Sequence, residues 1–501
     1  MESDLNNLLN GFQIALTPFN VGIAVMGIVF GTIIGVLPGL GGPNGVALLL
    51  PITFTMEPTS AIIFVSCIYW GALFGGAITS VLFNIPGEPW SVATTFDGHP
   101  MAQQGRAGEA LTAAFTSSFV GALFAVIVIT LVAPLVALFA LKFGPAEKFS
   151  VFFLAFCSFI GMGKEPPFKT LVSMMIGFAL AAVGLDSVTG QLRLTFGFTD
   201  FLNGFDFLIA VIGLFGIGEI LLTMEEGLAF KGKAVAINPR VVWQTWLELP
   251  RYWMTSLRSC LIGCWMGISP AGATPASFMS YGIAKRISKR GFNFGKGEIE
   301  GVVAPETAAH AAGTAALLPM LSLGVPGSPT AAVLLGGLLI WGLQPGPLLF
   351  VEQKDFVWGL IASMYIGNLV GLIIVLTMVP LFAAILRIPF SVIAPVILVI
   401  CAIGAYTVHN STFDVVMMLV FGIVGYVMKK CDYPLAPMVL AIVLGDKAEE
   451  AFRQSLLASQ GHLAVFWSNG LVGSIMALGL ISLFWPLIQG AWSRMRARPA
   501  S

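Results

Sequence analysis

The stretch Pro38 to Gly45 (PGLGGPNG) constrains the fold most, because its glycines and prolines interrupt a long apolar segment. No Asp, Glu, Lys or Arg occurs between Leu5 and Met56. In lipid every backbone N–H and C=O group needs a partner, so irregular backbone persists at depth only against protein or a watery cavity. A broken apolar segment therefore predicts a transport site, more so when another half of the chain carries a matching one.

The composition restricts the chain to polytopic helical membrane proteins. Of its 501 residues, 57% are hydrophobic and only 10% are charged, against about 25% charged in soluble proteins. Residues 111–141 form an uncharged run longer than the ~20 residues that cross a bilayer. The net charge is zero, so nothing in the composition suggests a nucleic-acid partner.

Basic residues gather in three segments, which should therefore be cytoplasmic. They are Lys231, Lys233, Arg240, Arg251 and Arg258, then Lys285, Arg286, Lys289, Arg290 and Lys296, and finally Arg494, Arg496 and Arg498. Only residues 257–284 separate the first two segments, and a second break, PAGATP (Pro270 to Pro275), divides them. Each arm is too short for the ~30 Å hydrocarbon core, so we predict a re-entrant hairpin with PAGATP at its tip.

The first half has a counterpart to this hairpin, and the match continues along the chain. Residues 21–56 have no basic residue at either end, which is expected for a hairpin that enters from the opposite face. Each hairpin is followed by another break, NIPGEP (84–89) or GVPGSP (324–329). Pro134 matches Pro380 and Asp186 matches Asp432, in both cases 246 residues later.

These matches predict an all-α polytopic membrane protein with two inverted repeats, each with a re-entrant hairpin and a Gly/Pro-broken helix. Residues 1–225 would form the first transmembrane repeat. Its N-terminal segment lacks the basic start of a cleaved signal peptide and should lie at the interface as an amphipathic helix. Residues 226–256 would be a cytoplasmic linker, 257–489 the second repeat and 490–501 a basic cytoplasmic tail.

The four breaks are the candidate site, because each leads into a helix N-terminus that can bind an anion. Their freed carbonyls and hydroxyls would suit Na⁺, and inverted symmetry would bring them together near the midplane. The alternative is that these glycines only permit close helix packing. Predicted substrate-binding residues are Gly41, Gly42, Pro43, Asn44, Asn84, Gly272, Ala273, Thr274, Ser277, Gly327, Ser328 and Thr330. Predicted cation-coupling residues are Pro38, Gly39, Pro86, Gly87, Glu88, Pro326 and Glu306.

Charged residues near the breaks allow several interpretations. Glu88 lies within a break, so a cation or proton role is plausible. Asp97, in the sequence DGHP, is interpreted as part of a structural turn. Glu306 follows a proline and would suit the first turn of a helix, where capping explains it as well as ion coupling. His310 could pair with Glu306 or simply pack. Lys429 is interpreted as an ordinary loop charge.

No enzyme is predicted, and no cofactor or metal is expected beyond a co-transported Na⁺. The sequence contains no nucleotide-binding loop after a strand and no zinc-ligand spacing. A membrane-embedded enzyme would have to rely on Glu306 and His310 alone. Cys260 and Cys264 lie one helical turn apart without a nearby histidine, which is typical of packing residues.

At these residues the chain resembles the large membrane subunit of the tripartite tricarboxylate transporter family. The resemblance is carried by residues 35–51 (GVLPGLGGPNGVALLLP), 69–105, 270–282 (PAGATPASFMSYG), 294–306 (FGKGEIEGVVAPE) and 321–350. It implies a permease that imports tricarboxylates or dicarboxylates such as citrate, coupled to Na⁺ or H⁺, in the bacterial inner membrane. It also implies a small four-helix membrane subunit and a periplasmic solute-binding protein as partners. The second candidate is a carboxylate carrier, exporter or channel that needs no binding protein.

The chain departs from the usual pattern of that family in three places. Ala309-His310 stands where an Asn pair is usual, and Ala77 stands where a Ser is usual. Gly42-Pro43-Asn44 is a variant of the usual tip. If these positions contact the solute, a carboxylate less charged than citrate would fit.

Overall fold

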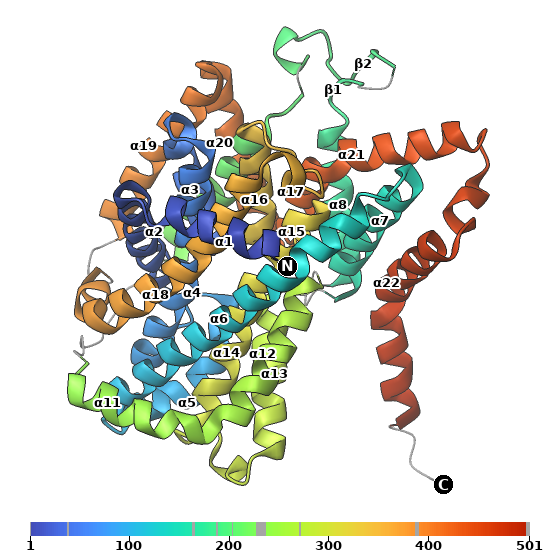
Figure 1. Cartoon of the computed structure of the whole chain (residues 1–501). Helices are drawn as coiled ribbons and strands as arrows, with labels where there is room; N and C mark the ends of the chain where they lie inside the picture. Colours follow the sequence, from blue (N-terminus) through green and yellow to red (C-terminus); the bar gives the residue numbers. More distant parts are fainter. Residues whose placement is uncertain are drawn as a thin grey trace.

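The computed structural model describes residues 2–37, 40–162, 166–186, 189–202, 204–226, 237–269, 272–385 and 390–496. These residues are almost entirely helical (Figure 1). Six of the described helices are long and apolar enough to cross a membrane: Pro18–Val36, Pro58–Phe83, Ala107–Ala140, Phe207–Glu225, Lys354–Ala384 and Thr412–Lys430. The protein is therefore an all-α, multi-pass membrane protein, as predicted.

The first half begins with a helix pair and a break. Its helices are α1 (Glu2–Ala15), α2 (Pro18–Val36), α3 (Gly41–Leu49), α4 (Pro58–Phe83), α5 (Val92–Gln103), α6 (Ala107–Ala140), α7 (Pro145–Met162) and α8 (Pro167–Ala181). A 3-10 turn, η2 (Pro89–Ser91), precedes α5. The half ends with α9 (Phe207–Val211), the π-helical turn η4 (Ile212–Ile217) and α10 (Gly218–Glu226).

The second half is also built of helices joined by short turns. It contains α11 (Pro239–Glu248), α12 (Trp253–Ile268), α13 (Ala273–Ile287), α14 (Glu300–Ala315), α15 (Leu317–Leu323), α16 (Pro329–Ile340) and α17 (Leu349–Glu352). It continues with α18 (Lys354–Ile385), α19 (Phe390–His409), α20 (Thr412–Lys430), α21 (Ala436–Ala458) and α22 (Gly470–Arg496). Short 3-10 turns lie at Leu50–Thr55 (η1) in the first half and at Leu249–Tyr252 (η5) and Gly291–Asn293 (η6) in the second half.

The two halves pack their first helices in the same way. A Cβ placed on Gly35 of α2 would lie 2.2 Å from the Ala72 carbonyl oxygen of α4. A Cβ placed on Gly267 of α12 would lie 2.2 Å from the Ala312 carbonyl oxygen of α14. Only glycine allows two helix backbones to approach so closely, and small residues commonly play this role in membranes.

Each half thus has a helix, a break and a second helix where a hairpin was predicted. In Figure 1, α3 lies in the upper part of the molecule, whereas α12 and α13 lie side by side in the lower part. Pro270 and Ala271, at the expected tip of the second hairpin, lie outside the described residues. Membrane re-entry, the inverted sense of the repeats and the domain boundaries remain predictions.

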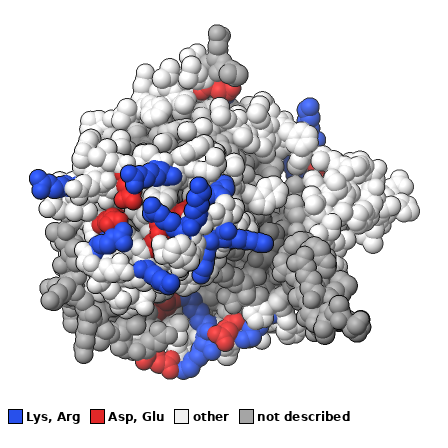
Figure 2. Space-filling view, turned by 90° about the horizontal axis from the view of Figure 1, so that it is seen from below, with Lys and Arg blue, Asp and Glu red and all other residues white. Residues whose placement is uncertain are grey.

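The basic segment after α13 lies on one end of the molecule. Lys285, Arg286, Lys289 and Arg290 are exposed at the end of α13, at the bottom of Figure 1. Figure 2 views this end directly and shows Lys and Arg side chains gathered there. Such a charge distribution is expected of a cytoplasmic face. Residues 231 and 233 of the first basic segment lie outside the described residues.

Helix α1 comes from the first half of the chain but packs mainly on α18 of the second half. It packs along α18, where a Cβ on Gly11 would lie 2.2 Å from the Trp358 carbonyl oxygen. The rings of Phe12 and Tyr365 are 5.7 Å apart. Leu5 and Leu9 nevertheless remain more than half exposed, which is compatible with the predicted interfacial helix.

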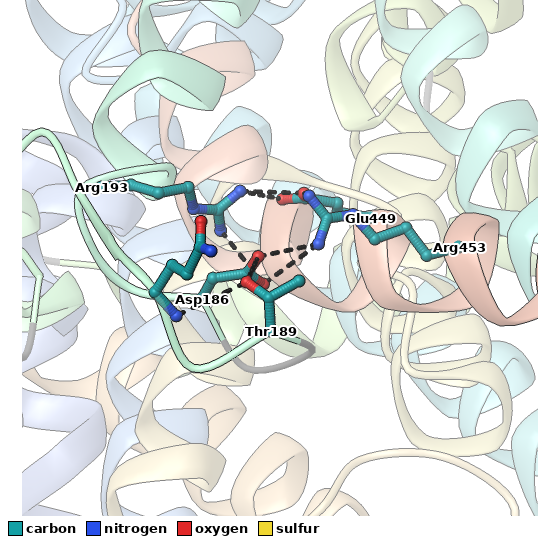
Figure 3. A network of polar contacts seen from close by, with 6 residues as sticks. Asp186, Thr189, Arg193, Glu449 and Arg453 are labelled. Atoms are coloured by element: carbon teal, nitrogen blue, oxygen red, sulfur yellow. Dashed lines mark hydrogen bonds and ion pairs between the residues drawn. The ribbon is translucent and has the colours of Figure 1, made fainter.

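The matched acids Asp186 and Asp432 have different surroundings. Asp186 follows β1 (Gly184–Leu185), which pairs antiparallel with β2 (Leu192–Arg193). Asp186 Oδ2 lies 2.8 Å from Arg453 Nη1 of α21, and Arg193 Nη1 lies 2.9 Å from Glu449 Oε1 (Figure 3). These ion pairs fasten the β-hairpin to α21. Asp432 is exposed, and its nearest cation is Lys169 at 3.8 Å.

Asp97 is not in a turn, so this prediction was wrong. It lies inside α5, as does Pro100, which had suggested a turn. The Asp97 carboxylate is fully buried and accepts N–H bonds from the loop at Gly295, Gly297 and Glu298. A carboxylate satisfied by several donors is stable without solvent, and this one joins α5 to the loop before α14.

Candidate functional site

All four breaks line one cavity of about 540 Å³. The first break contributes Leu40, Gly41, Pro43 and Asn44, and the break after α4 contributes Glu88, Pro89 and Trp90. The second half contributes Gly272, Ala273, Thr274 and Pro275 from one break and Ser328, Pro329 and Thr330 from the other. The gathering predicted from the repeat is thus present in the structure.

Three α-helices begin at this cavity, so their unpaired N–H groups are near it. Helix α3 starts at Gly41, α13 starts at Ala273 and α16 starts at Pro329. Gly41 and Gly272 have φ angles of 63° and 76°. This left-handed conformation favours glycine, because a side chain there is strained. The two glycines therefore allow the chain to turn sharply into each helix.

The breaks of the two halves contact each other across the cavity. Within the first half, the Gly42 N–H donates a hydrogen bond to the Glu88 carboxylate. A Cβ on Gly42 would also lie 3.2 Å from Thr330 Oγ1. On the other side, Ser277 Oγ donates to the Trp90 carbonyl oxygen over 2.7 Å. Each hairpin thus supports the broken helix of the opposite half.

Glu88 and Ser328 occupy corresponding positions in these broken helices. Glu88 is buried and precedes η2 as its N-cap residue. Ser328 precedes α16, and its Oγ accepts the N–H of Ala331 at 3.1 Å. At these matched positions the first half thus supplies a carboxylate and the second a neutral hydroxyl, and Lys429 and Asp432 of the second half also line the cavity.

Many cavity-lining residues were not among the predicted site residues, and Tyr69 and Lys429 are two of them. Tyr69 of α4 has its hydroxyl 3.4 Å from Ser328 Oγ. Lys429 lies in the last turn of α20, lines the cavity and forms an ion pair with buried Glu219 of α10. Its interpretation as an ordinary loop charge was wrong. The charge of Lys429 at the end of an apolar segment could have suggested a functional role.

Comparison with known proteins identifies the family of this chain. The pattern of the tripartite tricarboxylate transporter TctA family matches residues 21–440. The chain belongs to this family. TctA-family proteins are components of tripartite transporters, so further subunits are implied.

Two proteins of Agrobacterium vitis are similar to this TctA-family chain. One, an uncharacterized 52.8 kDa protein in the TAR-I ttuC′ 3′ region, is 38% identical over 479 residues, which is 95% of each chain. The other, an uncharacterized protein in the TAR-II ttuC′ 3′ region, is 38% identical over 233 residues, 46% of this chain and 96% of that protein. No solved structure matches the chain.

Several predicted site residues of this TctA-family protein do not line the cavity. Asn84 is exposed at the C-terminal end of α4, with a left-handed φ of 56°. The residues Gly42, Pro86, Gly87, Ser277, Pro326 and Gly327 lie outside the cavity lining, and Pro38 and Gly39 lie outside the described residues. Their assignment to substrate or cation binding remains a prediction.

Glu306 also lies away from the cavity, and its predicted position at a helix start was wrong. Helix α14 begins at Glu300 and continues through Pro305. Glu306 accepts hydrogen bonds from Thr94 Oγ1 at 2.5 Å and Ser118 Oγ at 3.0 Å. His310 Nδ1 lies 3.6 Å from Glu306 Oε2, so the suggested pair is present.

Proposed function

We propose that this chain is the permease subunit of a binding-protein-dependent secondary transporter that imports carboxylates, coupled to Na⁺ or H⁺, across the bacterial inner membrane. The observation that carries the proposal is the single cavity lined by all four breaks. Gly/Pro-broken helices from two repeats are typical of the central site in secondary transporters. Membership of the TctA family supports a tricarboxylate or dicarboxylate as solute.

The cavity has the chemistry that a carboxylate requires. Helices α3, α13 and α16 begin there, and helix N-termini attract anions. Asn44, Thr274 and Ser328 line it and can donate hydrogen bonds to a carboxylate. Lys429 adds a positive charge. A volume of about 540 Å³ is in the usual range for small-molecule sites, roughly 300–1,000 Å³.

Cation coupling is assigned to the acids Glu88 and Glu306. Glu88 lines the cavity, whereas Glu306 is buried between α5, α6 and α14. Backbone carbonyls of Pro38, Gly39, Pro86, Gly87 and Pro326 are proposed as additional oxygen ligands, because hard cations prefer oxygen. The proposed partners are a small four-helix membrane subunit and a periplasmic protein that delivers the solute.

Reconstitution into proteoliposomes tests this function. The chain and its small subunit would be supplied with the purified solute-binding protein, a panel of labelled carboxylates and an imposed Na⁺ or H⁺ gradient. Uptake should need both the binding protein and a gradient, and it should be restricted to carboxylates. Uptake that is unchanged without the binding protein would favour the second candidate, an independent carrier or channel.

A further inference from the structure

A buried polar cluster lies outside the cavity, where two halves of the chain meet. Its centre is Glu306, 2% exposed, with His310 fully buried one helical turn later on α14. Thr94 of α5 and Ser118 of α6 donate to the two carboxylate oxygens. The first half thus supplies two hydroxyl donors, and the second half supplies the carboxylate and the imidazole.

Among the described residues, two buried polar atoms of α14 lack a hydrogen-bond partner. In the described part of the chain, His310 Nε2 is buried without a hydrogen bond, and so is Thr314 Oγ1 one turn further along α14. His310 Nδ1 instead lies 3.2 Å from the Glu306 carbonyl oxygen. Buried polar atoms are nearly always paired, so two orphan atoms in succession indicate a place where a ligand is bound or passed on.

The donor set suits a proton better than Na⁺. Both hydroxyls direct their hydrogens toward the Glu306 carboxylate, whereas a sodium ion needs oxygen lone pairs directed toward it. The remaining neighbour is an imidazole, which favours transition metals over hard cations. A buried carboxylate with an imidazole 3.6 Å away can instead take up one proton, which either group can carry.

Helix α14 connects this cluster with the solute cavity. A Cβ on Gly313 would lie 3.1 Å from the Tyr69 hydroxyl, and Tyr69 lines the cavity. Gly313 follows Glu306 by seven residues, which is roughly 10 Å along a helix. A change of charge at Glu306 therefore acts on a helix that also contacts the cavity wall.

Other titratable groups face α14 from its neighbours. They are Asp97 on α5, Tyr281 on α13, Cys264 on α12 and Tyr69 on α4. Near the start of α14, Glu300 accepts bonds from Thr255 and Ser288, and Arg290 lies 3.6 Å from Glu298. Asp97 is occupied by three backbone N–H groups and by the Tyr281 hydroxyl. Glu306 and His310 differ from these groups because both are buried and the Nε2 atom of His310 has no hydrogen-bond partner among the described residues.

We propose that Glu306 and His310 are the binding site of the coupled ion and that this ion is a proton, which rests on the proposed secondary transport. Glu306 takes up the proton from the outer face together with solute binding and releases it to the inner face. Thr94 and Ser118 are positioning residues, because they act by stabilising the ionised carboxylate.

The experiment compares solute accumulation in proteoliposomes under a pH gradient with that under a Na⁺ gradient. The wild-type protein should accumulate solute under the pH gradient alone. Glu306→Gln should lose this accumulation at least tenfold, yet keep solute counterflow, which needs no gradient, within about threefold. Counterflow also reports that the variant is folded. The matched control is Glu300→Gln on the same helix, which should keep proton-driven accumulation.

A second variant tests the cluster if Glu306→Gln does not fold. Thr94→Val removes one hydroxyl that stabilises the ionised carboxylate, so the pH of half-maximal uptake should rise. An unchanged pH profile would contradict the inference, as would uptake driven by Na⁺ alone. If the wild type shows neither uptake nor counterflow, the proposed function falls, and this inference falls with it.

Discussion

The broken helices of the two halves make the same kind of backbone contact through a glycine. They differ in the residue that comes directly after this glycine. A Cβ on Gly87 would lie 2.2 Å from the Gly35 carbonyl oxygen, and one on Gly327 would lie 2.3 Å from that of Gly267. The next residue is Glu88 in one half and a serine in the other. The repeat thus preserves backbone geometry, whereas the charge in the cavity is specific to each half.

The predicted inverted sense of the two halves can be tested by an all-or-none labelling experiment. In a background without the six native cysteines, cysteines at Glu57 and Arg290 should react with an impermeant maleimide from opposite faces. Both residues are exposed beside a hairpin, one in each half. A cysteine at Lys233 should react from the same face as Arg290. Labelling of Glu57 and Arg290 from one face would contradict inverted repeats.

Adding a methyl group at either of the two matched glycines should abolish uptake to the same extent. Gly87→Ala and Gly327→Ala each place a Cβ against a carbonyl oxygen, and backbone cannot yield as a side chain does. We expect uptake to fall to background in both. Gly22→Ala and Gly282→Ala are the controls, since a Cβ at either meets nothing within 4 Å. Failure of only one of the two contact variants would show that the halves are not equivalent.

Removing the charge of Lys429 should reduce folding and uptake far more than removing the charge of its neighbour Lys430 on α20. Lys429→Gln leaves buried Glu219 without its partner, and breaking a buried pair costs about 3–5 kcal/mol. We expect the equilibrium constant for folding to fall by roughly a hundredfold or more, with a clear loss of uptake. Lys430→Gln, at an exposed site, should change uptake less than twofold. The double variant Lys429→Gln/Glu219→Gln should recover folding, because no buried charge is then unpaired.

The smallest expected effects concern one polar side chain from each hairpin. Asn44→Ala and Thr274→Ala remove cavity-lining donors, and hydrogen bonds to a charged group contribute about 1.5–3 kcal/mol. The half-saturating solute concentration should rise roughly tenfold to a hundredfold in each. Asn410→Gly is the control, because Asn410 lies outside the breaks with a left-handed φ of 53°. Wild-type half-saturation and rate in both variants would exclude the solute from this cavity.

The local sequence patterns predicted which backbone segments form the cavity, but they did not predict all the polar and charged side chains that line it. Glycine and proline reveal breaks directly, so segments as distant as Gly41 and Ser328 could be assigned to one site. The side chains of Tyr69 and Lys429 belong to regular helices, and the face they present depends on packing that the sequence does not specify.

At two positions a proline did not mark the helix end or turn that the sequence predicted. Pro100 and Pro305 lie inside helices α5 and α14, although each had suggested a helix boundary or turn. Inside a membrane protein, neighbouring helices can satisfy the freed backbone groups, so proline is tolerated in a helix interior. The local structure predicted at Asp97 and Glu306 was therefore wrong, whereas the structural role predicted for Asp97 is kept.

The packing of α1 on α18 has a consequence for biogenesis. Lys354, the first residue of α18, follows Ala15, the last residue of α1, by 339 residues. At translation rates of ~5–20 residues per second, α1 is made roughly 17–70 s before its partner. Until α18 has been made, the apolar stripe of α1 can be shielded from water by the membrane surface or by a chaperone. Helix α1 is thus synthesised well before α18 and can reach its final place only after α18 has been made.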